Sequence, residues 1–226
     1  MSPHTLGATA GLAAVLWDLD GRLVDTEPYW IEQEYALVAE FGGSWNDEHA
    51  HSLVGNDLIV SARYIARHGG VPLAPEEIIE RLLDGVVAQV RRHIPWRPGA
   101  RELLDGLRAQ AIPCALVTMS YQRLAQAVVE SLPPGTFSAV VAGDDVANGK
   151  PHPEPYLTAA ARLGVAPGEC VAIEDSPTGV ESAVAAGVHV LAVEHLLPIP
   201  AGPGRTHAVT LENWSPRELA ALLRSI

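Results

Sequence analysis

The stretch "LAAVLWDLD" at residues 12–20 is an apolar run that ends in two acidic residues, Asp18 and Asp20. A short apolar run of this kind is typical of a strand buried in a parallel sheet. Ligands of open parallel sheets bind at the carboxyl ends of the strands. The stretch therefore predicts a buried strand and, where it ends, a polar site.

Four more apolar runs follow, and helical patterns lie between them. The runs cover 112–120, 137–145, 169–177 and 187–195, and the helical patterns cover 99–110, 121–131, 153–163, 177–186 and 215–224. Strands that alternate with helices predict an α/β protein with a doubly wound parallel sheet.

Residues 26–97 interrupt this alternation, because they contain helical patterns and no clear strand. The helical patterns are at 28–41, 56–68 and 75–93. We expect an inserted all-helical cap domain at 26–97, a core domain made of 11–25 and 98–226, and a flexible tail at 1–10. The stretch "PIPAGPG" at 198–204 is expected to be a loop.

The composition restricts the class of partner. A net charge of −12 argues against nucleic acid and anionic membranes. No apolar run is long enough to span a bilayer, and the first residues lack the pattern of a secretory signal. Cys114 and Cys170 lie in apolar runs, which favours buried free thiols in a reducing compartment. We expect a cytoplasmic protein that binds a small molecule, as a monomer or a dimer.

Polar residues also stand at the ends of the later runs. They are Thr118 and Ser120 after the second run, Lys150 after the third, and Glu174 and Asp175 at the end of the fourth. Carboxylates without His or Cys favour Mg²⁺, and a hydroxyl and an ammonium suit phosphate oxygens. Ser120 and the pair Ser176–Pro177 also predict helix N-termini, which attract anions. One polar strand end is usually a turn or a cap, but agreement among four indicates a metal and phosphate site.

Lys150 is the only lysine in the chain, against fourteen arginines. A compact ammonium can stand between a carboxylate and a phosphate oxygen, where a planar guanidinium is bulkier and points its donors differently. The sequence therefore predicts that an ammonium is required at this position.

Other polar and aromatic residues have simpler interpretations. His49 and His51, in "EHAHS", are expected in a polar loop rather than at a metal. Tyr29, Trp30 and Trp45 are expected to pack in the core of the cap, with a surface for substrate as the alternative.

The polar stretches together resemble the four motifs of the haloacid dehalogenase (HAD) superfamily. The matching stretches are "DLDGRLVDTEP", "LVTMS", "GKPHPEPY" and "AIEDSPTG". They occur in the family's order over roughly residues 13–195, and the helical insertion stands where the family's C1 cap stands. The resemblance implies the HAD fold and a phosphatase activity.

The resemblance also implies a role for each matching residue. Asp18 would be the nucleophile that forms an aspartyl-phosphate, and Asp20 would be the general acid and then the general base. Mg²⁺ would be held by Asp18, the backbone carbonyl of Asp20, Asp175 and the nearby Glu174, and the phosphoryl group would be held by Thr118, Met119 and Lys150.

The implied reaction is Mg²⁺-dependent hydrolysis of a small phosphomonoester, such as a sugar or sugar-alcohol phosphate. Asp20 favours a phosphatase over a dehalogenase, because an alkoxide leaving group needs a proton. A β-phosphoglucomutase-like transferase is the alternative, but Trp30 and the loop around Gly55 offer no cation for a second phosphate. The candidate substrate contacts of the cap are Glu27, Trp30, Asn56 and Asp57.

Arg22 departs from the family pattern, which usually has Thr or a small aliphatic residue there. Its side chain could pair with Asp25 or Glu27, point to solvent, or reach the substrate. A HAD-fold protein that binds phosphate without turnover is therefore a further alternative. A receiver domain of two-component signalling is disfavoured, because it carries adjacent acids after its first strand and has no inserted helical domain.

Overall fold

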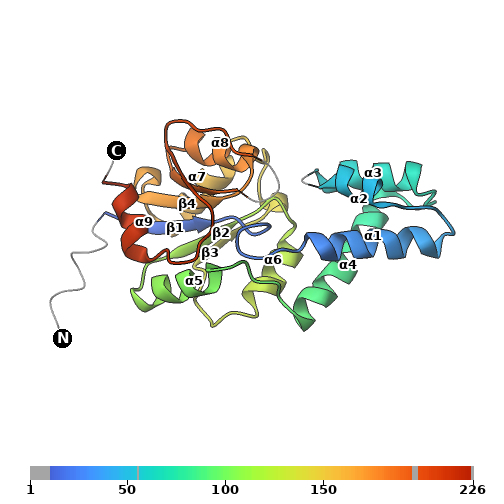
Figure 1. The fold of residues 1–226 in the computed structure, drawn as a ribbon, viewed down its shortest axis with the longest axis horizontal. Helices are drawn as coiled ribbons and strands as arrows, with labels where there is room; N and C mark the ends of the chain where they lie inside the picture. Colours follow the sequence, from blue (N-terminus) through green and yellow to red (C-terminus); the bar gives the residue numbers. More distant parts are fainter. Residues whose placement is uncertain (1–10, 55, 195–197, 225–226) are drawn as a thin grey trace. The chain divides into compact units, whose positions relative to one another are not determined.

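The computed structural model describes residues 11–54, 56–194 and 198–224, and these form two compact units (Figure 1). The sheet unit contains the described residues up to Val24 and from Trp96 onward, and the helical unit is Asp25–Pro95. Each unit has its own buried apolar core.

The sheet unit is built on six parallel strands in the order β3-β2-β1-β4-β5-β6. The strands are β1 (Ala14–Trp17), β2 (Cys114–Val117), β3 (Ala139–Val141), β4 (Cys170–Glu174), β5 (His189–Val193) and β6 (Arg205–Ala208). The order changes direction between β1 and β4, which is the point where open parallel sheets bind ligands. The predicted doubly wound parallel sheet is confirmed.

Helices cover both faces of this sheet, with α7 and α8 on one side and α5 and α9 on the other (Figure 1). The helices are α5 (Ala100–Ala109), α6 (Gln122–Val129), α7 (Glu154–Leu163), α8 (Pro177–Ala185) and α9 (Pro216–Leu222), with short 3₁₀ helices η1 (Gly143–Asp145) and η2 (Pro167–Glu169). Each of the five predicted helices is present, within a few residues of its expected ends.

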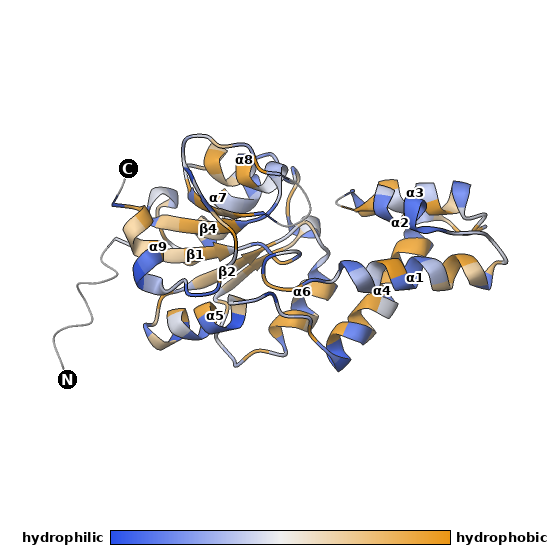
Figure 2. Cartoon of the chain, in the orientation of Figure 1, coloured by the Kyte–Doolittle hydropathy of each residue, from blue (hydrophilic) through white to orange (hydrophobic). Residues whose placement is uncertain are grey.

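The central strands are apolar along their length (Figure 2), because both of their faces are covered. Alternate residues such as Ala14, Leu16 and Ala172 pack with Tyr156 of α7 and Val180 of α8 in one buried cluster. This packing fixes the strand ends to which the polar residues are attached.

The two cysteines are buried and free, as expected. Cys114 begins β2 and Cys170 begins β4, the two strands that flank β1. Burial raises the pKa of the Cys114 thiol to about 12, so it stays protonated and packs as a small apolar group.

Strand β6 was not predicted. Its sequence "RTHA" has no apolar run, because it lies at the edge of the sheet and its residues are only partly buried. Neither an apolar run nor an alternating pattern in the sequence therefore indicates this strand.

The helical unit consists, in its described residues, of α1 (Glu27–Glu40), α2 (Asp47–Leu53), α3 (Leu58–His68) and α4 (Pro75–Arg92). The expected loop at "EHAHS" is wrong, because these residues belong to α2. Asn46 caps that helix by accepting a hydrogen bond from the backbone N–H of His49. Within the described residues no helix has the length and apolar character needed to cross a membrane.

Four rings of this unit form a cluster, namely Trp45 just before α2, His49 on α2, and Tyr64 and His68 on α3. Trp45 stacks on His49 at 4.8 Å between ring centroids, and Tyr64 stacks on His68 at 4.1 Å. Nδ1 of His49 is 3.0 Å from the Tyr64 hydroxyl, and Nδ1 of His51 is 2.6 Å from the carbonyl of Asp47. The two histidines thus contact different partners, which is what two positions of spacing on a helix produce.

We predict that Gly99→Ala destabilises the sheet unit by about 2 kcal/mol or more. Gly99 has φ +80°, and a Cβ atom there would lie 2.3 Å from the backbone of Leu211. Urea denaturation measures the loss. Gly106→Ala on α5 is the matched control, since its nearest neighbour would be a Pro216 ring atom at 3.4 Å and alanine favours a helix. Equal stability of Gly99→Ala and wild type would contradict the prediction.

We also predict that the free energy of unfolding of the helical unit falls as pH rises from about 5 to 8. Glu34 is buried beside Trp45, and burial raises its pKa from 4.5 to about 8. A carboxyl with a raised folded-state pKa stabilises the fold only while protonated, so this contribution is lost as pH rises through that value. Glu34→Gln should flatten the pH profile in urea denaturation. Glu32→Gln, an exposed change on the same helix, should leave the slope intact.

Candidate active site

The first acidic residue is placed by the end of β1. Asp18 follows the strand directly and donates its backbone N–H to the carbonyl of Ile173, at 3.0 Å, so it is tied to β4. Its side chain is buried. The chain then turns back at Gly21, which has φ +80° and donates its N–H to the carbonyl of Val24 at 2.7 Å. This tight turn holds Asp18 and Asp20 at the carboxyl edge of the sheet.

The side chain of Lys150 is buried at the same edge, and its ammonium group contacts three strand ends. Nζ donates to Oδ1 of Asp18 at 2.6 Å, to Oε1 of Glu174 at 2.6 Å and to the carbonyl of Val117 at 3.0 Å. Three donors arranged about one atom fit three oxygens that surround it, and a planar guanidinium does not. These three contacts favour an ammonium at position 150, and the requirement for one stays a prediction.

Glu174 is fully buried and holds Lys150 in place. Its Oε1 also accepts a hydrogen bond from the Tyr156 hydroxyl at 2.6 Å, and its Oε2 accepts from the backbone N–H of Asp175 at 3.0 Å. Both oxygens are therefore engaged within the protein, and Glu174 anchors Lys150.

The segment after β2 brings three residues to the site. Oγ1 of Thr118 is buried and accepts the backbone N–H of Ser120 at 2.9 Å. Sδ of Met119 lies 3.2 Å from the backbone N of Lys150, so its side chain packs on the loop that carries the lysine. Ser120 donates its hydroxyl to Oδ2 of Asp20 at 2.6 Å.

The expectation that Ser120 caps the helix after it is wrong. Helix α6 has Tyr121 at its N-cap position without a side-chain cap. Instead, Asp144 of η1 accepts the backbone N–H of Gln122 at 2.9 Å, which leaves Ser120 to bind Asp20. The other predicted cap is confirmed, because Oγ of Ser176 accepts the N–H of Gly179 at 3.0 Å with Pro177 in the first turn.

The charges at this edge are unbalanced. Burial raises the pKa of Asp18 well above its usual range; Lys150 opposes this rise, and Glu174 and Asp175 add to it. Burial, followed by Glu174, raises the pKa of Asp175 to about 7. Burial alone would lower the pKa of Lys150, but Asp18 and Glu174 raise it above its ordinary value. The group carries an excess of acids that a further cation would relieve.

The donor set fits Mg²⁺. Asp18, Glu174 and Asp175 each offer a carboxylate oxygen, and these atoms lie within 4.8 Å of one another. Oxygen donors with no His or Cys among them are the ligands that Mg²⁺ prefers. We call these three residues the carboxylate cluster.

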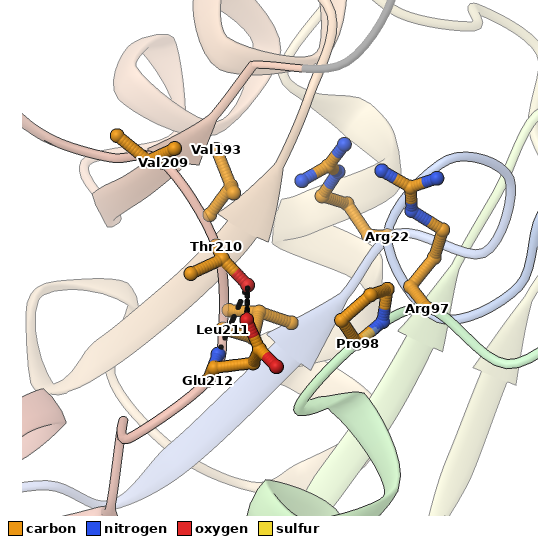
Figure 3. Close-up of a pocket in the computed structure, with 8 residues that line it drawn as sticks. All are labelled: Arg22, Arg97, Pro98, Val193, Val209, Thr210, Leu211 and Glu212. Carbon is orange, nitrogen blue, oxygen red and sulfur yellow. Dashed lines mark hydrogen bonds between the residues drawn. The ribbon is translucent and has the colours of Figure 1, made fainter.

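Arg22 is buried beside the carboxylate cluster, so the expectation that it could point to solvent is wrong. Its Nη2 lies 3.7 Å from Oδ2 of Asp175. Arg22 also lines a pocket of about 260 Å³ together with Arg97 (Figure 3). The other lining residues are Pro98, Val193, Val209, Thr210, Leu211 and Glu212.

The four candidate substrate residues of the helical unit lie on α1 and just before α3. Trp30 is half-buried on α1, with Glu27 in the first turn of that helix. Asn56 donates its side-chain amide to the carbonyl of Ser52 at 3.0 Å, and Asp57 caps α3 by accepting the N–H of Ile59 at 2.8 Å. Asn56 and Asp57 thus have local structural partners.

Two contacts of the site were not anticipated. Tyr156 stands at the end of the third motif-like stretch, but nothing in the sequence indicates that its hydroxyl reaches Glu174, eighteen positions away. Arg22 departs from the family pattern in the sequence, but its contact with Asp175 depends on the turn after β1 and on the pairing of β1 with β4. Both contacts are products of the tertiary structure.

Comparisons with known proteins identify the family of this chain. A family model described as haloacid dehalogenase-like hydrolase matches residues 15–193. The chain is 37% identical to hexitol phosphatase A of Escherichia coli (strain K12), over 87% of this chain and 88% of that protein. It is 32% identical to a phosphorylated carbohydrates phosphatase of Thermotoga maritima, over 82% and 87%. The crystal structure of CbbY from Rhodobacter sphaeroides in complex with phosphate superposes with a TM-score of 0.80 at 26% identity, covering 92% of this chain and 99% of that one.

We predict that Gly179→Ala destabilises the protein by roughly 3 kcal/mol, because it displaces a buried charge from its partners. A Cβ atom at Gly179 would lie 2.0 Å from Oε1 of Glu174, which is held by Lys150 and Tyr156. Urea denaturation checks this. Gly168→Ala is the control, since its Cβ would meet nothing closer than the carbonyl of Gly187 at 3.9 Å. Equal free energies of unfolding for Gly179→Ala and Gly168→Ala would contradict the prediction.

Proposed function

This chain belongs to the haloacid dehalogenase-like hydrolase family and is a phosphatase of that family, and we propose that it hydrolyses a small sugar or sugar-alcohol phosphate through an aspartyl-phosphate on Asp18. The observation that carries the proposal is the buried contact of Lys150 with Asp18 at 2.6 Å. A carboxylate that attacks a phosphate dianion meets charge repulsion, and an ammonium at this distance lowers it.

In the proposed first step, a carboxylate oxygen of Asp18 attacks phosphorus and the bond from phosphorus to the ester oxygen breaks. Asp20 gives its proton to the departing alkoxide, which leaves as an alcohol. The hydroxyl of Ser120 is 2.6 Å from Oδ2 of Asp20 and is suited to orient that carboxyl group. Thr118 and Lys150 are suited to bind the oxygens of the phosphoryl group, and Met119, the residue after Thr118, is the third proposed phosphate-binding residue.

In the proposed second step, water attacks phosphorus of the aspartyl-phosphate and Asp20 removes a proton from that water. The bond between phosphorus and the Asp18 oxygen breaks, which releases inorganic phosphate and restores both carboxyl groups. Asp20 therefore acts as an acid and then as a base, which requires that the leaving alcohol and the attacking water use the same side of the site.

Asp18, Asp175 and the backbone carbonyl of Asp20 are the proposed ligands of Mg²⁺, with Glu174 beside them. Bound there, Mg²⁺ would neutralise charge on the phosphoryl oxygens and on Asp18. The support for this assignment is the distance of 4.8 Å or less among the three carboxylates, together with the excess of acids at this edge.

The proposed substrate class follows the named activities of the relatives, two of which act on hexitol phosphates or phosphorylated carbohydrates. We propose that the helical unit, as a cap, selects among such compounds, and that Glu27 and Trp30 are its first candidates for substrate contact. A transferase of the mutase type must bind a second phosphate, and neither position 30, which is Trp30, nor the sequence "LVGNDL" around Gly55 supplies a cation for it.

We predict phosphate release from hexitol and hexose phosphates that requires Mg²⁺, is lost in EDTA, and is lost in Asp18→Asn. Lys150→Arg should lower kcat/KM by about a hundredfold or more, because the guanidinium cannot reach all three oxygens that Lys150 contacts. Arg217→Lys, an exposed change on α9, is the matched control and should retain activity.

Full activity in Asp18→Asn, or near wild-type turnover in Lys150→Arg, would contradict this mechanism. If β-glucose 1-phosphate were converted to the 6-phosphate without net phosphate release, the mutase assignment would replace the hydrolase.

A further inference from the structure

Arg22 places a positive charge against the carboxylate cluster without a directional bond to it. Its side chain is 3% exposed, and Nη2 lies 3.7 Å from Oδ2 of Asp175. Among the residues that the structure describes, the Nε and Nη2 atoms of Arg22 find no hydrogen-bond partner. What joins Arg22 to the cluster is therefore charge rather than hydrogen-bond geometry.

A buried guanidinium with unsatisfied nitrogens is unfavourable unless nearby acids compensate it. The acids that act on Arg22 are Asp175, Asp18 and Glu174, the same three residues that form the carboxylate cluster. The negative charge of the cluster therefore stabilises the buried Arg22. In turn, the positive charge of Arg22 lowers the negative electrostatic potential at the cluster.

The pocket beside Arg22 is lined by one other cation, Arg97, and by one acid, Glu212. On the wall of the neighbouring pocket stands Arg97, a second guanidinium (Figure 3). Like charges repel, so Arg97 disfavours a turn of Arg22 toward that pocket. Arg22 keeps its charge at any physiological pH, because the pKa of a guanidinium stays far above neutrality.

We infer that Arg22 lowers the affinity of the carboxylate cluster for Mg²⁺ and so sets the Mg²⁺ concentration that this enzyme needs. The inference rests on the proposed function, which assigns Mg²⁺ to this cluster. A unit positive charge a few ångströms from a divalent ion changes its binding constant by on the order of tenfold, even at a high effective dielectric constant. Lys150 is also a cation, but it donates hydrogen bonds to Asp18 and Glu174 and has a proposed role in the reaction. Arg22 has no proposed role in the reaction, so its charge can be removed to test its effect on the metal.

The test is titration calorimetry of the intact protein with MgCl₂ at constant ionic strength. Arg22→Met and Arg22→Gln remove the charge and keep a side chain of similar length. Arg22→Lys keeps the charge and changes the shape. Arg217→Met, exposed on α9, makes the same change in net charge away from Asp175 and is the matched control.

We expect the dissociation constant for Mg²⁺ to fall about tenfold in Arg22→Met and Arg22→Gln, and to remain within twofold of wild type in Arg22→Lys and Arg217→Met. Damage to the loop would weaken binding, so a gain of affinity separates removal of charge from misfolding. An unchanged or weaker constant in both neutral variants would overturn the inference.

Asp175→Asn distinguishes failure of this inference from failure of the proposed metal site. If Asp175→Asn loses Mg²⁺ binding while Arg22→Met and Arg22→Gln bind as wild type does, only the inference about Arg22 is wrong. If Asp175→Asn binds Mg²⁺ as wild type does, the metal is not at the carboxylate cluster, and the inference falls together with that part of the proposed function.

Discussion

The ammonium of Lys150 joins three strands of the sheet at one atom. Nζ contacts Asp18 after β1, the carbonyl of Val117 at the end of β2, and Glu174 at the end of β4, all within 3.0 Å. Burial of several carboxylates at one sheet edge is unfavourable without such a cation, because their charges repel. The site therefore depends on this single ion pair network, and the strand order β2-β1-β4 is what brings its members together.

The packing of the sheet unit serves the same network. Tyr156 comes from α7, lies in the apolar cluster beneath the sheet, and reaches Glu174 with its hydroxyl at 2.6 Å. Gly179 on α8 leaves the space that the Glu174 carboxylate occupies. Two helices on one face of the sheet thus fix Glu174. Helix α7 contributes the hydroxyl group of Tyr156, and α8 contributes the space left at Gly179. A rigid acid keeps Lys150 in place, and preorganised charges act without reorganisation when the reaction occurs.

The sheet and the members of the site could be predicted because both depend on short-range signals. Apolar runs marked β1 to β5, and the polar residues at their ends identified Asp18, Lys150 and Asp175. The edge strand β6 and the short helix α2 have weak periodicity, and their existence depends on tertiary packing or on a cap such as Asn46. The partner of Ser120 could not be predicted either. The backbone N–H of Gln122 in α6 is bound by Asp144, which lies on a different element, and Ser120 binds Asp20 instead.

An acidic chain can bind a phosphate dianion only where the local charge differs from the net charge. At this edge of the sheet the acids of the carboxylate cluster, with Asp20 beside them, outnumber the cations Lys150 and Arg22, so binding of phosphate alone is disfavoured. A divalent cation offsets this excess of negative charge, and phosphate binding then becomes more favourable. Arg22 has two effects on this charge. It reduces the excess of negative charge that attracts the metal, and it reduces the repulsion between the cluster and the phosphate. A small residue in its place would leave both tasks to the proposed metal ion, and under our inference the residue at position 22 shifts the affinity of the cluster between cation and anion.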